Sequence, residues 1–162
     1  MASWTGEQES VALLDPVAGT FTFAGVLGDL YMWSSQFEYD DAMRTAYAFG
    51  QNRASQENVY TLSLGSQTAT SAEVGGVQDG GLTNLVLGGV AADGKLVIAY
   101  WGGVEKLGFL DPATGLSTFS GVMDGLFMWS DQLVYGRTTG MTVGYGQDHS
   151  GANHFYVNAL GN

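Results

Sequence analysis

One segment of this chain occurs twice, 96 residues apart. Residues 13–25 read LLDPVAGTFTFAG, and residues 109–121 read FLDPATGLSTFSG. When residues 13–65 are aligned with residues 109–161 without gaps, 19 of 53 positions are identical, where chance would give about three. Any fold of this chain must therefore accommodate a duplicated unit.

The 96-residue unit is itself double. The stretch SGVMDGLFMW at 120–129 is similar to AGVLGDLYMW at 24–33, and VYTLSLGSQTAT at 59–70 matches LGFLDPATGLST at 107–118. The shorter period is therefore about 44–52 residues, and each period holds four strand-like segments.

The segments within each period have the composition of short strands and tight turns. KLVIAYW at 95–101 is a nearly continuous apolar run, which is typical of a strand buried on both faces. It follows Ala-Asp-Gly-Lys at 92–95, a hairpin signal, and DPATG at 111–115 has the residues of a turn. No stretch of a dozen residues shows a helical period, so the sequence predicts an all-β chain without a long helix.

Repeated four-stranded units of about 45 residues are typical of β-propeller blades. FLDPATGLST resembles the corner between the third and fourth strands of many propellers, such as the kelch, YVTN and quinoprotein-type repeats. YWGGVEKLGFLDPATG is also similar to a kelch repeat because Gly102 and Gly103 precede the strand that ends in Asp-Pro. This resemblance implies a β-propeller-like fold with about three blades per chain, with a β-sandwich built from the same hairpins as the alternative. The glycine pair is missing from the other repeats, so no particular family is assigned.

The strand pattern predicts one β-repeat domain over 1–162, with a partial blade at 10–25, blades at 26–76 and 77–121, and a partial blade at 122–162. Because typical propellers have about four to eight blades, three blades would not close a ring. Unclosed ends would expose apolar edge strands. We therefore expect a homo-oligomer, with a dimer favoured, in which the N-terminal strands of one chain complete the C-terminal blade of another. The alternative is a fragment of a longer propeller.

The charge of the chain argues against several partners. Sixteen Asp and Glu residues stand against five Lys and Arg, for a net charge of -11. Nucleic acids and anionic membrane surfaces require a basic patch, which the sequence lacks. We find no signal peptide in MASWTGEQES and no apolar run near the ~20 residues of a membrane span, and no compartment is predicted. The absence of cysteine excludes disulfides and thiol chemistry.

Three tryptophans are candidates for ligand binding. Trp33 and Trp129 occupy the same position in the two copies, and Trp101 is the last residue of the apolar run at 95–101. Exposed aromatic rings form platforms for sugars and other flat apolar ligands. Packing within or between blades is the competing interpretation for all three.

The stretch FEYDDAMR at 37–44 carries acids that the second copy lacks. No cofactor is predicted for the chain, but Glu38, Asp40 and Asp41 are three carboxylates on one loop and could together bind Ca²⁺. Glu38 and Asp40 lie two positions apart, so on a strand they would share a face and could form an acid–base pair. With Arg44 they are the candidate catalytic residues. A solvated loop on an acidic protein is the alternative.

The two histidines are candidates for a metal site. His149 and His154 flank SGAN, and a hairpin could bring them together with Asp148. The same residues also suit an ordinary turn.

No catalytic motif is recognisable, which favours a non-catalytic binding or interaction module that recognises a glycan, a small molecule or a protein. Two alternatives remain. One is a hydrolase or lyase with a carboxylate and histidine site at the mouth of the propeller channel. The other is a purely structural component of a surface or virion.

Overall fold

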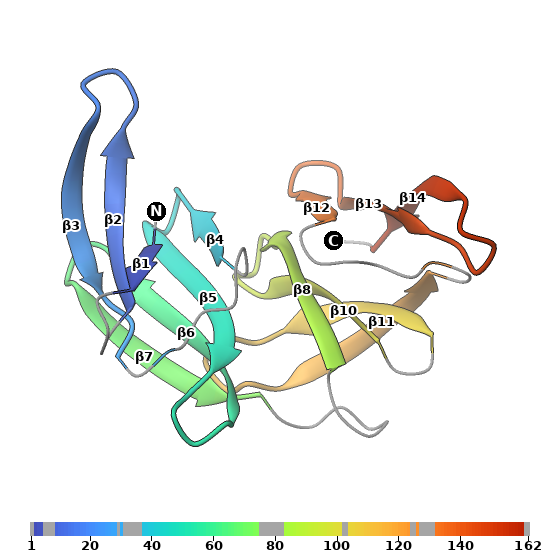
Figure 1. Cartoon of the computed structure of the whole chain (residues 1–162), viewed down its shortest axis with the longest axis horizontal. Coiled ribbons are helices and arrows are strands. Elements are labelled where there is room, and N and C mark those ends of the chain that lie inside the picture. The colour runs from blue at the N-terminus through green and yellow to red at the C-terminus, as the bar shows by residue number, and fades with distance from the viewer. Residues whose placement is uncertain are drawn as a thin grey trace. The chain divides into compact units, whose positions relative to one another are not determined.

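A computed structural model of the chain describes residues 2–4, 9–28, 30, 37–74, 83–101, 104–123, 126 and 132–160. Within these ranges all regular structure is β-strand, in 14 strands, and no helix is present (Figure 1). The prediction of an all-β chain is therefore confirmed. No helix long and apolar enough to cross a bilayer is found in the part of the chain that is described.

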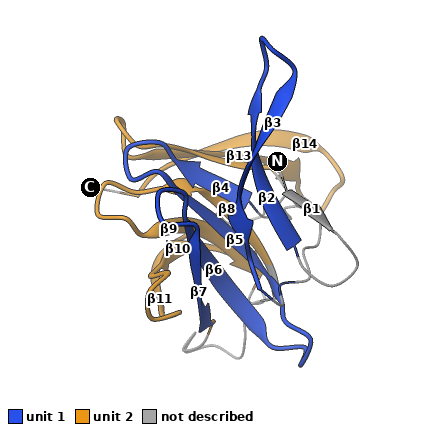
Figure 2. Cartoon of the chain, turned by 90° about the vertical axis from the view of Figure 1, so that its left-hand side faces the viewer, with its two compact units in different colours: residues 1–73 blue, residues 74–162 orange. Residues whose placement is uncertain are grey.

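The chain divides into two compact units, residues 1–73 and 74–162 (Figure 2). The first unit contains two antiparallel sheets. One has the order β1-β2-β3, with strands β1 (Ala2–Trp4), β2 (Glu9–Asp15) and β3 (Thr20–Val26). The other has the order β4-β5-β6-β7, with strands β4 (Phe37–Asp40), β5 (Thr45–Gln51), β6 (Glu57–Ser63) and β7 (Thr68–Glu73). The β2–β3 hairpin extends beyond the other strands of this unit (Figures 1 and 2).

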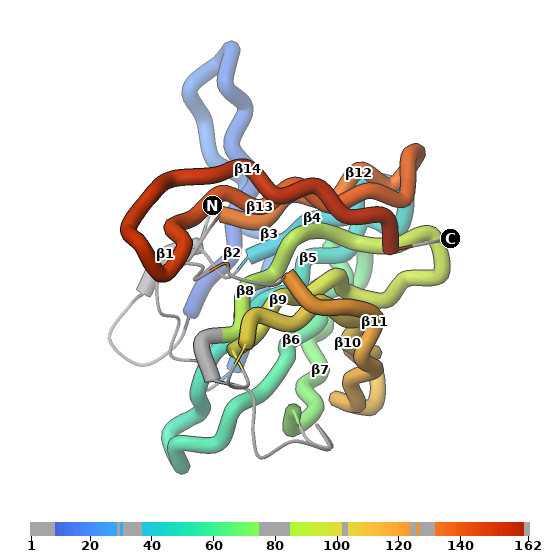
Figure 3. Tube along the Cα trace, turned by 90° about the vertical axis from the view of Figure 1, so that its right-hand side faces the viewer, coloured from blue at the N-terminus to red at the C-terminus, as the bar shows by residue number. Residues whose placement is uncertain are grey.

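The second unit also contains two antiparallel sheets. One has the order β11-β10-β9-β8, with strands β8 (Thr83–Val90), β9 (Leu96–Trp101), β10 (Glu105–Leu110) and β11 (Ser117–Met123). The other has the order β12-β13-β14, with strands β12 (Leu133–Gly136), β13 (Met141–Gln147) and β14 (Asn153–Ala159). The long β13–β14 hairpin can be followed in Figure 3. The two four-stranded sheets span Phe37–Glu73 and Thr83–Met123, and the blade boundaries drawn from the sequence stay a prediction.

The first sheet holds one strand more than the sequence predicted. Residues 10–25 were expected to supply two strands, and they correspond to β2 and β3. β1 pairs with β2 in the register Ala2 to Val11 and Trp4 to Glu9. Backbone hydrogen bonds therefore join β2 to a neighbour on each side, β1 on one and β3 on the other.

The duplication extends to the irregular features of the backbone. The β2–β3 register shifts between Val11 and Ala12, and the β10–β11 register shifts between Leu107 and Gly108, 96 residues later. Both bulges bend a hairpin at the same place. The turns after these strands match as well, because Gly19 and Gly115 donate backbone hydrogen bonds of 2.8 Å to the carbonyl oxygens of the preceding Asp15 and Asp111.

Each unit is held together by a hydrophobic cluster that joins its two sheets. The clusters use the same repeat positions, and these are occupied by Val11 and Leu107, Leu27 and Met123, Leu30 and Leu126, Phe37 and Leu133, Tyr60 and Tyr156, and Leu64 and Leu160. Burial of one such large apolar side chain stabilises a fold by roughly 1.5–3 kcal/mol. The duplication therefore preserves the interface between two sheets as well as the strands of each sheet.

The two glycines at the bulges provide a test of this packing. Gly25 has a φ of 153°, and a Cβ added there would lie 2.7 Å from Cδ1 of the fully buried Leu62. Gly121 is its repeat counterpart, and a Cβ there would meet nothing within 4 Å. We expect Gly25→Ala to lower the free energy of unfolding by about 1–3 kcal/mol through overpacking and backbone strain. Gly121→Ala should change it by less than about 0.5 kcal/mol. Urea unfolding of both variants measures the difference, and equal losses would contradict it.

Candidate functional site

One face of the β12–β14 sheet is apolar and exposed to solvent. Along β13, exposed and buried positions alternate strictly, and the buried side of the strand holds the small residues Thr142, Gly144 and Gly146. That side belongs to the face that carries Leu133 and Tyr156 of the hydrophobic cluster. We call the opposite side the open face; it consists of Val134, Met141, Val143, Tyr145, Phe155 and Val157.

The side chains of the open face form continuous cross-strand rows. Val134, Val143 and Val157 lie directly opposite one another across the three strands. Tyr145 lies opposite Phe155, and their ring centroids are 5.0 Å apart with a tilt of 48°. Phe155 is nevertheless 75% exposed and Val134 is 65% exposed. Such cross-strand pairs stabilise the sheet only modestly. They also leave much of the apolar area of this face in contact with water.

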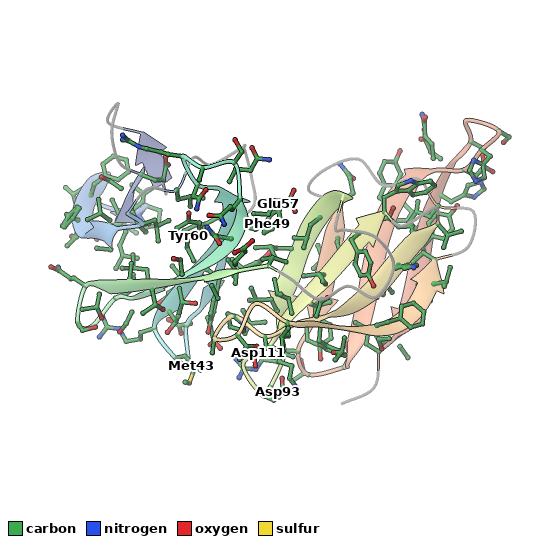
Figure 4. The ribbon with its side chains drawn as sticks, turned by 90° about the horizontal axis from the view of Figure 1, so that it is seen from below. Met43, Phe49, Glu57, Tyr60, Asp93 and Asp111 are labelled. Carbon is green, nitrogen blue, oxygen red and sulfur yellow. The ribbon has the colours of Figure 1, made fainter. Side chains whose placement is uncertain are left out.

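The same face is buried in the first copy of the repeat. The positions 96 residues before Val143, Tyr145 and Phe155 lie on β5 and β6, where they hold Tyr47, Phe49 and Val59. These three side chains are only 5%, 9% and 0% exposed. Figure 4 labels Phe49 on this face. The repeat thus places equivalent side chains in a packed interior in one copy and in solvent in the other.

A polar group of side chains borders the open face. Gln132, Gln147 and Asn153 line a shallow cavity of about 350 Å³ together with Tyr145 and Gly146. Gln147 lies opposite Asn153 at the end of the β13–β14 pair. An apolar surface with amide groups along its border has the anatomy of a protein-binding patch.

The β13–β14 turn brings together two of the three residues proposed as metal ligands. Asp148 Oδ1 accepts hydrogen bonds from the Ser150 backbone N–H at 2.8 Å, the Ser150 hydroxyl at 2.6 Å and the Ala152 backbone N–H at 3.0 Å. Its Oδ2 lies 3.0 Å from His154 Nε2. His149 is exposed on the turn. The hydrogen bonds from the Ser150 hydroxyl, the Ala152 backbone and His154 lower the pKa of Asp148 to about 2.

The repeat shows that this constellation forms a turn. Asn52 occupies the position of Asp148 in the first copy, and its Oδ1 accepts from the backbone N–H groups of Ala54 at 2.9 Å and Gln56 at 3.0 Å. The Asn52 side-chain amide then donates to Gln56 Oε1 at 3.0 Å. An Asx-type turn is therefore common to both copies, and the Asp148–His154 pair is an addition of the second.

The acidic residues of the 37–44 stretch differ in burial and in their hydrogen-bond partners. Asp40 is 3% exposed, and its Oδ1 accepts from the backbone N–H groups of Ala42 at 2.9 Å and Met43 at 3.2 Å. Asp41 is exposed and accepts a hydrogen bond from the Tyr39 hydroxyl at 3.4 Å. Asp40 thus stabilises the β4–β5 turn.

Two more of the predicted candidates lie beside this turn. Arg44, also exposed, ends the turn with a φ of 48°, and its carbonyl accepts from the Leu64 N–H. Glu38 lies half-buried on β4, and burial raises its pKa to about 6. Glu38 and Asp40 occupy alternate positions of β4, as the sequence predicted, and their role as an acid–base pair stays a prediction.

Of the tryptophans proposed for ligand binding, Trp101 lies partly buried at the end of β9, opposite Glu105 and Thr83. Trp33 and Trp129 lie outside the described residues. Within the described ranges, no group of three His, Asp or Glu side chains is arranged to hold a metal ion.

A second cavity, of about 370 Å³, lies in the second unit beside Phe109, Tyr135 and Leu160. Its polar border is the ion pair of Lys95 and Asp93, whose charged atoms are 2.6 Å apart. Asp111 adds a second negative charge near Lys95, and Figure 4 labels both acids. The charged groups at this cavity therefore already interact with one another.

Two buried carboxylates were not among the residues selected from the sequence. Glu9 and Glu105 begin β2 and β10, 96 residues apart, and are only 5% and 3% exposed. Burial raises the pKa of Glu9. The motif that revealed the duplication begins at residue 13, so these acids precede it, and only an extension of the alignment would have found them.

Comparison with known proteins shows the fold alone. No family model matches the chain, and no curated protein matches it. The structure is similar to the crystal structure of TolB from Acinetobacter baumannii, with a TM-score of 0.64 and 11% sequence identity. The similarity covers 98% of this chain and 37% of the TolB chain. The chain therefore has a β-propeller-type fold of repeated antiparallel sheets, as the sequence predicted, and spans about a third of the length of TolB.

The Asp148 turn makes the stability of the chain depend on pH. Because the folded pKa of Asp148 is lowered, its ionised form stabilises the fold at pH values above about 4, and this contribution is lost as pH falls through 2. Asp148→Asn keeps an acceptor for the turn, as Asn52 does, whereas Asp148→Ala removes it. We expect the urea midpoint at pH 7 to decrease from wild type to Asp148→Asn to Asp148→Ala.

The gap between wild type and Asp148→Asn should narrow as pH falls below 4. Asn52→Ala is the matched control, because it removes the equivalent turn without removing a charge. A gap that stays the same from pH 7 to pH 3 would contradict the ionic contribution.

Glu38 should have the opposite pH dependence. Because burial raises its folded pKa to about 6, ionisation of Glu38 destabilises the fold, and stability decreases as pH rises from about 4.5 through 6. Glu38→Gln should therefore unfold at a higher urea concentration than wild type at pH 7.5 and at the same concentration at pH 4. Glu73→Gln, at an exposed position on β7, makes the same charge change and should lack this effect. A Glu38→Gln gain that is equal at both pH values would refute the ionisation mechanism.

Proposed function

We propose that this chain is a non-catalytic interaction module of β-propeller type that binds a protein through the open face of β12–β14. The observation that carries the proposal is the exposure of a continuous apolar row and an aromatic pair on that face. Contiguous exposed apolar surface is typical of protein–protein contact sites. Aromatic residues are also the side chains that most often dominate the binding energy of an interface.

The polar candidates favour a binding role over catalysis. The carboxylates of Asp40 and Asp148 accept hydrogen bonds from backbone N–H groups of their own turns. A general base needs its carboxylate directed at a substrate proton. Asp40 and Asp148 are therefore better suited to holding hairpins than to turnover, which weighs against the hydrolase or lyase alternative.

A flat sheet face favours a protein over a glycan or a small molecule. Small ligands bind in concave sites that bury most of their surface. The open face extends over three strands, and its central row is made of valines, which provide apolar contact but no hydrogen bonds to sugar hydroxyls. A protein surface of similar apolar character would cover all of it.

The fluorescent apolar dye 1-anilinonaphthalene-8-sulfonate tests whether the open face is an accessible surface. At a concentration at which sedimentation velocity shows only monomer, we expect the wild-type chain to bind the dye, and Val143→Lys with Val157→Lys to reduce this binding about two-fold or more. The dye is an anion, so added lysines would by themselves increase its binding, and a decrease must come from lost apolar surface.

Val17→Lys with Leu116→Lys is the matched control. Both residues are exposed and apolar, both lie at hairpin turns, neither belongs to the open face, and the charge change is the same. If the open-face variant and this control bind the dye equally, the proposed surface is not the accessible one and the proposal fails.

A further inference from the structure

We infer that the partner of the open face is a second copy of this chain, which docks through the exposed face of its β2–β3 hairpin. This inference rests on the proposed function and names the partner. It differs from the strand exchange expected from the sequence, because it joins two sheet faces and transfers no strand between chains.

The β2–β3 hairpin has an apolar face outside its own core. Leu14 lies opposite Phe21 and Ala12 lies opposite Phe23, so these four side chains share one face. Leu14, Phe21 and Phe23 are about half exposed, at 45%, 55% and 54%. The opposite side of the hairpin contributes Val11 and Ala24 to the hydrophobic cluster of the first unit. We call the exposed side the hairpin face.

The repeat identifies part of the hairpin face as a position for packing. The counterpart of Leu14 is Leu110, which is 0% exposed. The counterpart of Phe21 is the small polar Ser117, so the hairpin face has gained an aromatic ring at a position where β11 has none. Phe23 and its counterpart Phe119 are both exposed, so the cross-strand pair of Leu14 and Phe21 is what distinguishes the hairpin face from the equivalent face of β10 and β11.

Each of the two exposed faces has counterpart positions elsewhere in the repeat that are buried. The open face is the side of β12–β14 whose counterpart on β5 and β6 is buried, and the hairpin face carries a leucine whose counterpart on β10 is buried. Within each unit the chain already packs one sheet face against another through a hydrophobic cluster. A second copy offers the same kind of partner to each face.

Charge supports a contact at these two faces. The chain carries a net charge of -11, which opposes association of two copies at most surfaces. Neither face contains a charged residue, since one consists of Val134, Met141, Val143, Tyr145, Phe155 and Val157 and the other of Ala12, Leu14, Phe21 and Phe23. The contact therefore buries apolar area without bringing carboxylates directly together.

Each such contact joins two different surfaces of identical chains, and in a two-fold symmetric pair the same contact is made twice. Two chains that each use both faces form a closed dimer, and their sheets number eight, from four in each chain. Eight lies within the range of about four to eight blades that propellers use. We therefore expect a dimer of twice 17.1 kDa.

Complementation between two variants tests the inference. Leu14→Lys with Phe21→Lys disables the hairpin face, and Val143→Lys with Val157→Lys disables the open face. All four residues are exposed, and the lysines lower the net negative charge, so lost association cannot come from added repulsion. By sedimentation velocity, wild type should have about twice the mass of either variant alone. An equimolar mixture of the two variants should recover the dimer mass, because it retains one intact pair of faces.

The control is again Val17→Lys with Leu116→Lys, which should remain dimeric, and circular dichroism checks that every variant is folded. The inference is overturned if wild type is a monomer at all concentrations, if either face variant dimerises alone, or if the mixture stays monomeric. Dye binding separates the two proposals when it is measured on monomer, either dilute wild type or the hairpin-face variant, because no second copy then covers the open face. A wild type that is a monomer at all concentrations and whose open face still binds the dye refutes the second copy as partner and leaves the proposed function intact, whereas loss of the dye difference refutes the proposed function.

Discussion

The packing of one sheet on the next through a small hydrophobic cluster is the interaction on which this structure depends. Sheets of three or four strands bury one face only if another element covers it, and in each unit that element is the next sheet along the chain. The duplication preserves this contact closely: Leu27 and Met123, and Leu30 and Leu126, are all almost completely buried. Both copies need this interface between sheets, because a sheet alone cannot exclude water from its apolar side.

The two copies diverge where the backbone no longer constrains the side chain. The hairpin turn at Asn52 needs one oxygen acceptor, and Asp148 supplies the same acceptor while adding a charge and a contact to His154. Similarly, Gly25 lies against Leu62, whereas Gly121 faces open space. In both copies the turn and the bulge lie at equivalent positions, whereas the side chains around them differ. One copy can vary in this way so long as its turn and bulge keep their hydrogen bonds.

The open face, which is the proposed binding surface, has the pattern of an ordinary packing face. Its residues keep the alternation that β-sheet packing requires, with small residues on the cluster side of β13 and large apolar residues on the other. Equivalent positions in the first copy hold Tyr47 and Val59 in the interior. The proposed interaction surface therefore requires no special motif. It arises from an ordinary packing face that the described chain leaves in contact with solvent, on a fold shared with TolB at only 11% identity.

The repeat, the all-β composition and the order of strands in the two four-stranded sheets could be predicted from the sequence. The same is true of the turns at Asp15 and Asp111. All of these features follow from local periodicity and turn chemistry. The sequence did not reveal β1, whose three residues acquire their strand conformation by pairing with β2. Nor could it separate the roles of the candidate acids or show that Phe155 is exposed while its counterpart Val59 is buried. Burial depends on which sheet covers a face, and that is set by contacts between segments far apart in the chain. Which of these equivalent side chains are buried could therefore be seen only in the folded structure.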